Sequence, residues 1–245
     1  MKRVFARCPR LTRLGFAHGF GTAASHGRPP QRTVTVRQVH GVRMVRAEDV
    51  PGVEVDARTP DPREVEARPA ADVRPEADAL WAVTPGLAVG VLTADCLPLL
   101  MVVPDRGAVA AVHAGWRGSV AGIAERAAIA LAEQVGISPA EITAVVGPHI
   151  GPCCYEVDEP VIAAVRDRAA LGPGRTPDRA QLDLYTLNRI QLERAGLPSE
   201  SILRVPGCTH CDPSFASYRR DRTPLRMIHY VRVPARSGAP QRVTR

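Results

Sequence analysis

Four apolar segments follow one another between residues 77 and 116 with only short polar breaks. Turn signals separate them at Thr84-Pro85-Gly86 and at Pro104-Asp105-Arg106-Gly107. Apolar runs of this length between turn residues are typical of buried strands, and their spacing predicts a meander in one sheet. Cys96 and His113 then fall near the ends of neighbouring strands. The segments read ADALWAV, LAVGVLTADC, LPLLMVV and GAVAAVHAGW.

Alternation and capping residues predict the other elements. Thr33–Val39 has β-branched residues at alternate positions, which predicts a strand that ends beside His40, with Met44 and Val45 in a partner strand. Helix signals and two late strands complete the pattern. They are a helix capped by Ser119 and ended by Gly136, a capping box at Ser138-Pro139-Ala140-Glu141 before the apolar run 143–146, helices 159–171 and 184–195 capped by Asp158 and Asp183, and strands 202–205 and 225–233.

The order of these elements predicts an α+β fold, because strands come first and no regular β-α-β alternation follows. We expect one domain over residues 1–234, a surface loop at 48–75 that is rich in Pro, Asp, Glu and Arg, and a disordered tail at 235–245. Even the most apolar stretch, Leu87–Pro104, contains Asp95, which argues against a membrane span. Arginines interrupt the first residues, so we expect no signal peptide and a cytoplasmic location.

The net charge of +7 does not predict a nucleic-acid partner. The basic residues are arginines except Lys2 and are scattered along the chain, and aromatic residues make up only 4% of it. The six cysteines are expected to be reduced thiols, which favours metal binding or reactivity over disulfides.

Three short pieces place a metal-binding side chain at a predicted strand end: QVHG with His40, TADC with Cys96 and VHAGWRG with His113. Two imidazoles and one thiolate suit zinc and leave a fourth position open, as catalytic zinc requires. The sequence alone leaves another interpretation open, in which Cys96 is a small buried residue and both histidines are structural.

The same region also predicts an anion site. Gly115 and Gly118 flank Arg117 just before a predicted helix, so backbone N–H groups and a guanidinium could converge on phosphate. A tight turn with a solvated arginine is the alternative.

Cys208-Thr209-His210-Cys211 has a C-x-x-C spacing that can hold zinc or support redox chemistry. We expect no second pair to complete it, because Cys153 and Cys154 are adjacent and point apart in any regular segment. His149 and His229 are expected to be structural.

The motifs as a set resemble the laccase-domain family, also called the multicopper polyphenol oxidase family, over about Phe16–Tyr230. The resemblance implies a layered α/β/β/α sandwich similar to the catalytic domain of cytotoxic necrotizing factor. It also implies a zinc-dependent purine nucleoside phosphorylase for inosine, guanosine, adenosine and methylthioadenosine, with adenosine deaminase activity, and a zinc-binding catalytic triad of His40, Cys96 and His113. The motifs are RQVHG, ADAL, TADC, VHAGWRG, VGPHIGPCCYEV, LDL, CT and FASYRR.

Two departures from the family pattern concern substrate range. The Arg-x-Gly-Gly-Val-Ser segment expected after the first HGF motif is replaced by Gly21–Gly27, and Thr223-Pro224-Leu225 precedes the closing Arg226 where relatives have Gly beside that arginine.

Other functions remain open from the sequence. No His-x-His pair occurs, so a full multicopper centre is not expected, although Cu²⁺ could load the three-donor site in vitro and support polyphenol oxidation. Cys96 and His113 could instead be the nucleophile and base of a hydrolase or deamidase, and a zinc ion with four protein ligands would indicate an interaction protein. For the phosphorylase, the expected partners are purine nucleosides and phosphate, and the expected state is a monomer.

Overall fold

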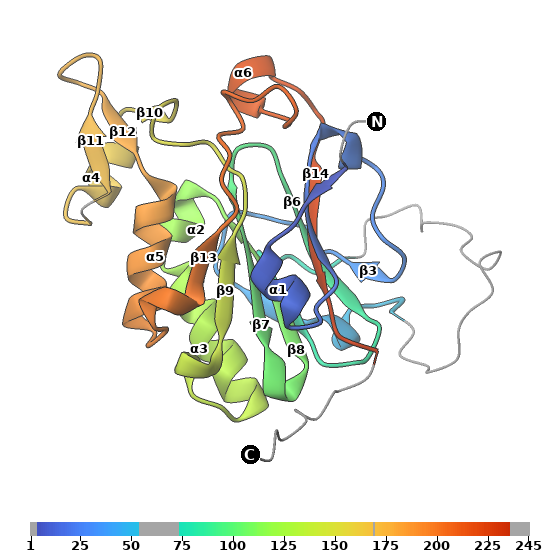
Figure 1. The fold of residues 1–245 in the computed structure, drawn as a ribbon. Helices are drawn as coiled ribbons and strands as arrows, with labels where there is room; N and C mark the ends of the chain where they lie inside the picture. Colours follow the sequence, from blue (N-terminus) through green and yellow to red (C-terminus); the bar gives the residue numbers. More distant parts are fainter. Residues whose placement is uncertain (1–3, 54–73, 169, 236–245) are drawn as a thin grey trace.

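The computed structural model describes residues 4–53, 74–168 and 170–235 of the chain. Most of the predicted loop 48–75, namely 54–73, lies outside the described residues, as does all but the first residue of the predicted tail. The described part is a mixed α+β fold with three sheets, as predicted in class. Figure 1 shows two of these sheets at the centre, with the long helices on one side and a small sheet at an upper corner.

The strands are ordered as follows in each sheet. The six-stranded sheet has β13 (Ile202–Arg204), β9 (Thr143–Val146), β7 (Leu97–Val103), β8 (Ala108–Ala114), β5 (Ala79–Ala82) and β4 (Met44–Arg46). The five-stranded sheet has β1 (Phe5–Ala6), β2 (His18–Gly21), β14 (Met227–Arg232), β6 (Ala88–Thr93) and β3 (Thr33–Val34). The small sheet has β10 (Glu156–Val157), β12 (Ala180–Leu182) and β11 (Leu171–Pro173).

The helices are short apart from two. They are α1 (Pro9–Arg13), α2 (Trp116–Val120), α3 (Ile123–Val135), α4 (Val161–Val165), α5 (Leu184–Arg194) and α6 (Tyr218–Asp221), with 3₁₀ turns at Ala23–Ser25, Ala47–Asp49, Pro104–Arg106, Pro139–Glu141 and Ser199–Ser201.

The four apolar segments are strands, as predicted, but they do not form a meander in one sheet. β5, β7 and β8 lie together in the six-stranded sheet, whereas β6 pairs with β14 and β3 in the other. Every residue of β7 and β8 is buried, and all but one residue of β6 is. Strands that are apolar on both faces carry no alternation that assigns them to one sheet, which is why the meander prediction is wrong.

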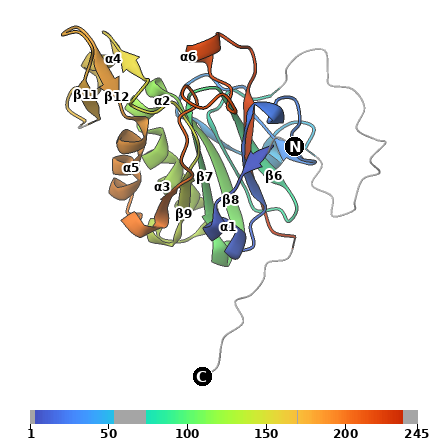
Figure 2. The same cartoon turned by 45° about the horizontal axis from the view of Figure 1, so that its top comes forward.

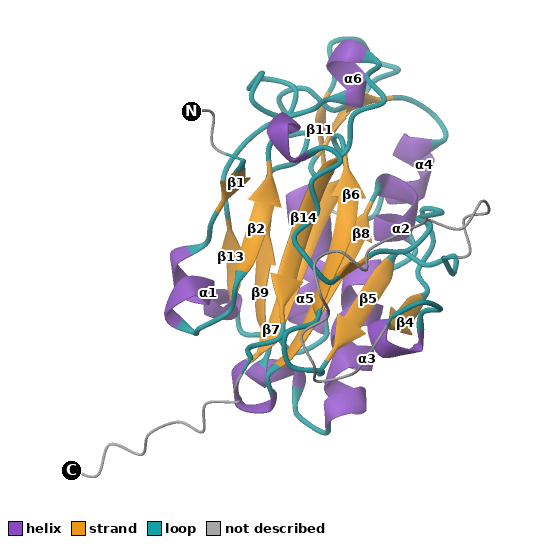
Figure 3. Ribbon diagram, turned by 90° about the vertical axis from the view of Figure 1, so that its right-hand side faces the viewer, coloured by secondary structure: helices purple, strands orange, loops and turns teal. Residues whose placement is uncertain are grey.

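The six-stranded sheet is buried on both faces. One face packs against the five-stranded sheet through residues such as Leu100, Val109 and Val91, and the other packs against α3 and α5 through residues such as Met101 and Leu131. Figure 3 looks onto the five-stranded sheet, with the long helices behind it. The described residues therefore form an α/β/β arrangement, and the outer helical layer of the predicted α/β/β/α sandwich is absent from them. The likeness to cytotoxic necrotizing factor stays a prediction.

Three of the predicted helix signals are confirmed. Gly136 ends α3 in the left-handed conformation that glycine favours. Ser138 and Glu141 form the reciprocal hydrogen bonds of a capping box. The Asp183 side chain accepts from the N–H of Thr186 and caps α5.

Two other helix predictions are wrong. Ser119 lies inside the short helix α2 and is fully buried, where its hydroxyl accepts a hydrogen bond from Asn188, and α3 starts only after Gly122. The helix expected over 159–171 is only α4, because the chain has turned into strand β11 by Leu171. For Ser119, the hydrogen bond from the distant Asn188 is a contact that a local signal does not contain.

Candidate metal centre

The pairing of β7 with β8 brings Cys96 and His113 together. Cys96 directly precedes β7. His113 lies on β8, opposite Pro98 of β7, so Cys96 and His113 are at the same end of the sheet. This confirms the predicted placement at neighbouring strand ends. His113 is almost fully buried and Cys96 is half-buried.

His40 reaches the same place from a turn. The strand predicted over Thr33–Val39 stops at Val34, which corrects its length, and the chain turns at His40 with a backbone φ of 61°. A positive φ is uncommon for residues other than glycine and needs support from the surroundings. Asp78 gives that support, because its carboxylate accepts the N–H groups of Val39, His40 and Gly41 at 3.2, 2.9 and 2.7 Å.

The three predicted ligands form one cluster. Their ligand atoms all lie within 4.8 Å of one another, and the Sγ of Cys96 lies 4.0 Å from the Nε2 of His40. The His40 and His113 rings meet edge to face with centroids 4.8 Å apart. Nitrogen and sulfur ligands of tetrahedral zinc are about 3.5 Å apart. The donor set and its spacing therefore fit a zinc ion, and His40 is exposed to solvent.

Asp78 also orients the buried histidine. Its Oδ1 lies 2.7 Å from the Nδ1 of His113, and the Asp78 side chain is fully buried. A carboxylate on one ring nitrogen of a histidine is the usual partner of a metal ligand and leaves Nε2 to face the metal. Asp78 was not predicted, although a charged residue inside the apolar segment ADALWAV is a signal for such a role.

The electrostatics of the cluster favour a thiolate. Burial raises the pKa of Cys96, but the neighbouring His113 and His40 lower it more strongly, to about 6. Burial lowers the pKa of His113, while Cys96 and Asp78 raise it to about 9. The thiolate is the form of cysteine that binds metals and attacks electrophiles, so Cys96 has the charge state that a metal ligand or a nucleophile requires.

Comparison with known proteins decides the family. The sequence model of a family described as multi-copper polyphenol oxidoreductase laccase matches residues 21–233. The chain belongs to this laccase family. A protein of Geobacillus stearothermophilus named purine nucleoside phosphorylase YlmD is 36% identical over 196 residues, which are 77% of this chain and 72% of that protein. A purine nucleoside phosphorylase of Streptomyces coelicolor is 39% identical over 213 residues, with coverages of 85% and 78%.

Solved structures agree with the family assignment. The crystal structure of YlmD from Geobacillus stearothermophilus matches with a TM-score of 0.78 and 26% identity, and the match covers 94% of this chain and 99% of that one. The crystal structure of YfiH from Bacillus licheniformis matches with a TM-score of 0.72 and 26% identity, covering 89% and 93%. Among the residues described for this laccase-family chain, no helix is long and apolar enough to cross a membrane.

The glycines of VHAGWRG let the backbone of this laccase-family chain pass close to the other two motifs, where a side chain would not fit. A Cβ on Gly115 would lie 2.8 Å from Cδ2 of His40 and 3.2 Å from the Sγ of Cys96. A Cβ on Gly118 would lie 2.8 Å from the backbone oxygen of Gly41. Both glycines, which were predicted as phosphate ligands, thus have a packing role against the two other motifs.

Substitution of Gly115 by alanine is expected to weaken zinc binding about 10-fold, since the added methyl displaces His40 or Cys96. The backbone of Gly115 has a φ of −72°, so the fold should tolerate the change. Equilibrium zinc competition with a chromophoric chelator measures the affinity. Gly41→Ala is the matched control, because its Cβ has no contact closer than 3.5 Å. Equal affinities of the two variants would contradict this assignment.

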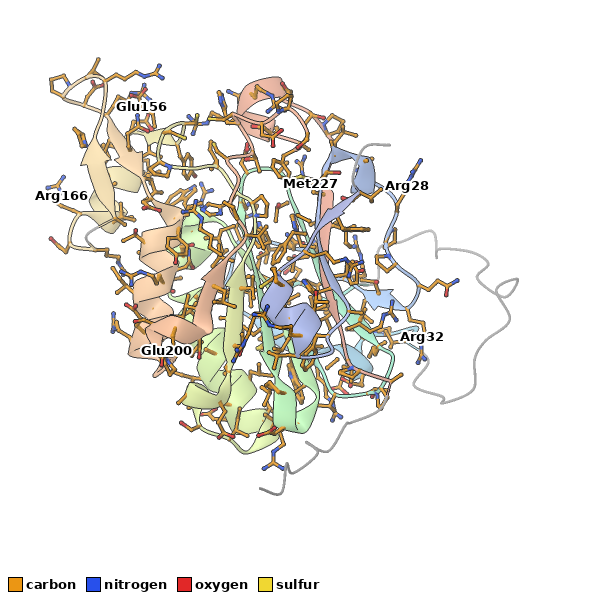
Figure 4. All side chains as sticks on the ribbon, in the orientation of Figure 1. Arg28, Arg32, Glu156, Arg166, Glu200 and Met227 are labelled. Atoms are coloured by element: carbon orange, nitrogen blue, oxygen red, sulfur yellow. The ribbon has the colours of Figure 1, made fainter. Side chains whose placement is uncertain are left out.

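Two arginines stack on aromatic rings in segments that follow β8 and β9. The exposed Arg117 stacks over the Trp116 ring at 4.4 Å, and Arg219 lies 5.3 Å from the centroid of the Tyr155 ring. Burial and the charge of Cys96 raise the pKa of Tyr155, whereas Arg219 and Arg117 lower it. Arg219 also donates to the backbone oxygen of Glu156, which is labelled in Figure 4 and lies in β10 of the small sheet. Neither Tyr155 nor Arg219 was predicted individually.

The prediction that Cys153 and Cys154 point apart is wrong. Their thiols join those of Cys208 and Cys211 in a second group whose sulfur atoms all lie within 4.8 Å. The reason is local, because the backbone N–H groups of Cys154 and Tyr155 both bond to the oxygen of Gly151 and close a turn. Adjacent side chains alternate in a strand but can share a side in a turn. His149 and His229 are fully buried, as expected for structural histidines.

Proposed function

We propose that this laccase-family protein is a zinc-dependent purine nucleoside phosphorylase that also deaminates adenosine. Its substrates would be inosine, guanosine, adenosine or methylthioadenosine together with phosphate, and its products the free base and ribose 1-phosphate. The observation that carries the proposal is the cluster of His40, Cys96 and His113, which offers three donors in a chain whose relatives are named purine nucleoside phosphorylases. We further propose one catalytic domain over residues 1–234 that acts as a cytoplasmic monomer on small molecules and not on nucleic acid.

His40, Cys96 and His113 would hold the zinc ion, with Asp78 fixing His113 and the turn of His40. When bound, Zn²⁺ supplies Lewis-acid polarisation of a substrate oxygen. Among the described residues no fourth His, Cys, Asp or Glu joins this group, which leaves room for substrate and speaks against a purely structural ion. Cu²⁺ can load the same donors in vitro, and a phenol oxidation assay of the copper-loaded protein tests the polyphenol oxidase alternative.

Arg117 is the proposed phosphate ligand, together with the backbone at Gly115 and Gly118. Its guanidinium is exposed and lies over the Trp116 ring, in the helix that directly follows the strand of His113. A guanidinium offers paired donors to phosphate oxygens, which orients the phosphate for attack at the anomeric carbon of the ribose.

Arg117→Ala is expected to raise the KM for phosphate about 10-fold with a smaller change in the KM for inosine, because one charge-assisted contact is lost. Steady-state kinetics with phosphate varied at saturating inosine measures the effect. Arg106→Ala is the matched control, since Arg106 lies in the turn between β7 and β8 at the opposite end of those strands. An unchanged phosphate KM in Arg117→Ala would remove Arg117 from this role.

The experiment that tests the function is chromatography of products from metal-quantified protein incubated with inosine or adenosine, with and without phosphate. Release of hypoxanthine from inosine only with phosphate supports phosphorolysis, and formation of inosine from adenosine without phosphate supports deamination. Both activities should disappear on chelation, return with Zn²⁺ and be missing in His113→Ala. Absence of turnover of any of the four nucleosides by the zinc-loaded protein would refute the proposal.

A Cys–His hydrolase or deamidase is the second candidate, because one specific arrangement favours it. Cys96, His113 and Asp78 stand in the order of nucleophile, base and orienting carboxylate, and the pKa of Cys96 is lowered to about 6. Metal dependence separates the two functions. A hydrolase should retain activity in the chelated protein and lose it after alkylation of Cys96, whereas the phosphorylase should already be inactive after chelation.

A further inference from the structure

We propose that Cys153, Cys154, Cys208 and Cys211 bind a second zinc ion, in a closed site made of four thiolates. This site is separate from the cluster of His40, Cys96 and His113 and does not depend on the proposed function. Its ligands come from the loops that follow β9 and β13.

The distances between the sulfur atoms suit a metal ion. The Sγ of Cys211 lies 3.3 Å from that of Cys154 and 3.8 Å from that of Cys153, and all four sulfur atoms lie within 4.8 Å of one another. With Zn–S bonds of about 2.3 Å, the sulfur atoms of tetrahedral zinc are about 3.8 Å apart. A disulfide needs about 2.05 Å, and all six cysteines of the chain are free. The cluster therefore has the dimensions of a tetrathiolate metal site.

The loop backbone is shaped around these sulfur atoms. The N–H of Gly151 donates to the Sγ of Cys208 at 3.3 Å, a type of contact that stabilises metal-bound thiolates. A Cβ on Gly151 would lie 3.3 Å from the Sγ of Cys153 and 3.6 Å from that of Cys208. Cysteine binds metal as the thiolate, and a divalent cation would offset the mutual repulsion of four bound thiolates.

The position of the site indicates what the ion would do. β9 and β13 are parallel neighbours, and the loops that follow them stay paired through His149 and Cys208. Figure 2 brings this end of the molecule forward, where α6 and the small sheet lie. Thr209, between two of the cysteines, donates from its hydroxyl to Asp95 at 2.6 Å, and Asp95 also accepts the N–H of Arg219. A zinc ion would thus fix the loop whose Thr209 holds Asp95, the residue that precedes Cys96.

Metal stoichiometry tests the proposal. The wild-type protein, purified without chelator, is expected to hold about two zinc ions per chain, and both Cys208→Ser and His113→Ala about one. Cys8→Ser is the matched control, because Cys8 is a buried cysteine outside both groups and its loss should leave about two. X-ray absorption of zinc in His113→Ala should show four sulfur ligands at about 2.3 Å.

A measurement on the wild type covers the case in which a cysteine variant fails to fold. Alkylation followed by peptide mass spectrometry should find these four cysteines protected, and exposed to the reagent after zinc removal. About one zinc ion per chain in the wild type, four freely alkylated thiols in the untreated protein, a disulfide among them, or iron in place of zinc would each overturn the proposal. None of these readouts uses catalytic activity, so failure of this site and failure of the proposed function are distinguishable.

Discussion

Asp78→Ala is expected to weaken zinc binding at the cluster of His40, Cys96 and His113 by about 10-fold to 100-fold. The carboxylate holds the Nδ1 of His113 and the three N–H groups of the turn at His40, so one substitution releases two ligands. It should also reduce the free energy of unfolding by about 3 kcal/mol, because His113 and the N–H groups of the turn lose the carboxylate that they bond to in the folded protein. Burial raises the pKa of Asp78, but His113 and the N–H group of Gly41 outweigh it and keep that pKa low.

Zinc competition and urea unfolding measure the two effects. Glu76→Ala is the matched control, because Glu76 is a nearby acidic residue in a half-exposed ion pair with Arg37 and should change little. Asp78→Asn separates charge from shape, since the amide oxygen can still accept from the turn while the charge facing His113 is lost. Zinc affinity unchanged in Asp78→Ala would show that the carboxylate does not organise the site.

Acid is expected to destabilise the protein steeply below pH 6.5, mainly through two buried histidines. Burial lowers the pKa of His229 to about 3 and that of His149 to about 4, while the unfolded chain has the ordinary value near 6.5. The unfolded state therefore takes up protons first, and stability present above pH 6.5 is lost as the pH falls towards the folded values. Each histidine contributes about 1.4 kcal/mol per pH unit, so about 5 kcal/mol is lost by pH 4.5. That loss is comparable to the total stability of many domains.

The hydrogen bonds explain why these histidines resist protonation. His229 accepts from the N–H of Gly21 and can donate only to Thr93, and the Nε2 of His149 is buried without a partner. Urea unfolding of the metal-free protein between pH 6.5 and 4.5 measures the slope, and His149→Gln should reduce it by about one proton. His26→Gln is the control, because His26 is exposed. A slope that is the same in wild type and His149→Gln would contradict the assignment. His113 acts in the opposite direction above pH 6.5 in metal-free protein, so the test is made below it.

The sequence predicted the strands better than their partners. The apolar segments around Leu100 and Val109 are strands, but a segment buried on both faces does not reveal its sheet, and β6 went to the other one. The capping box at Ser138 and the Asp183 cap, whose side chain accepts from the N–H of Thr186, were predicted correctly. The cap predicted at Ser119 was wrong, because the Ser119 hydroxyl accepts a hydrogen bond from Asn188 of the distant helix α5.

The candidate site shows the same division. His40, Cys96 and His113 were predicted from residue type and motif, because ligand chemistry is a property of single side chains. Asp78 was missed, since its role depends on a turn and a strand that meet only in the folded chain. The cysteine group was missed because adjacent residues were assumed to alternate, and the turn at Gly151 breaks that alternation.

The unequal exposure of the three donors has a kinetic consequence. His113 and Cys96 are carried by or adjoin strands in the interior of a sheet, whereas His40 stands exposed on a turn. An exposed turn opens more readily than strands paired inside a sheet, and the three hydrogen bonds to Asp78 oppose that opening. Metal exchange would therefore begin with release of His40, and its rate would follow the opening of that turn and not the unfolding of the domain.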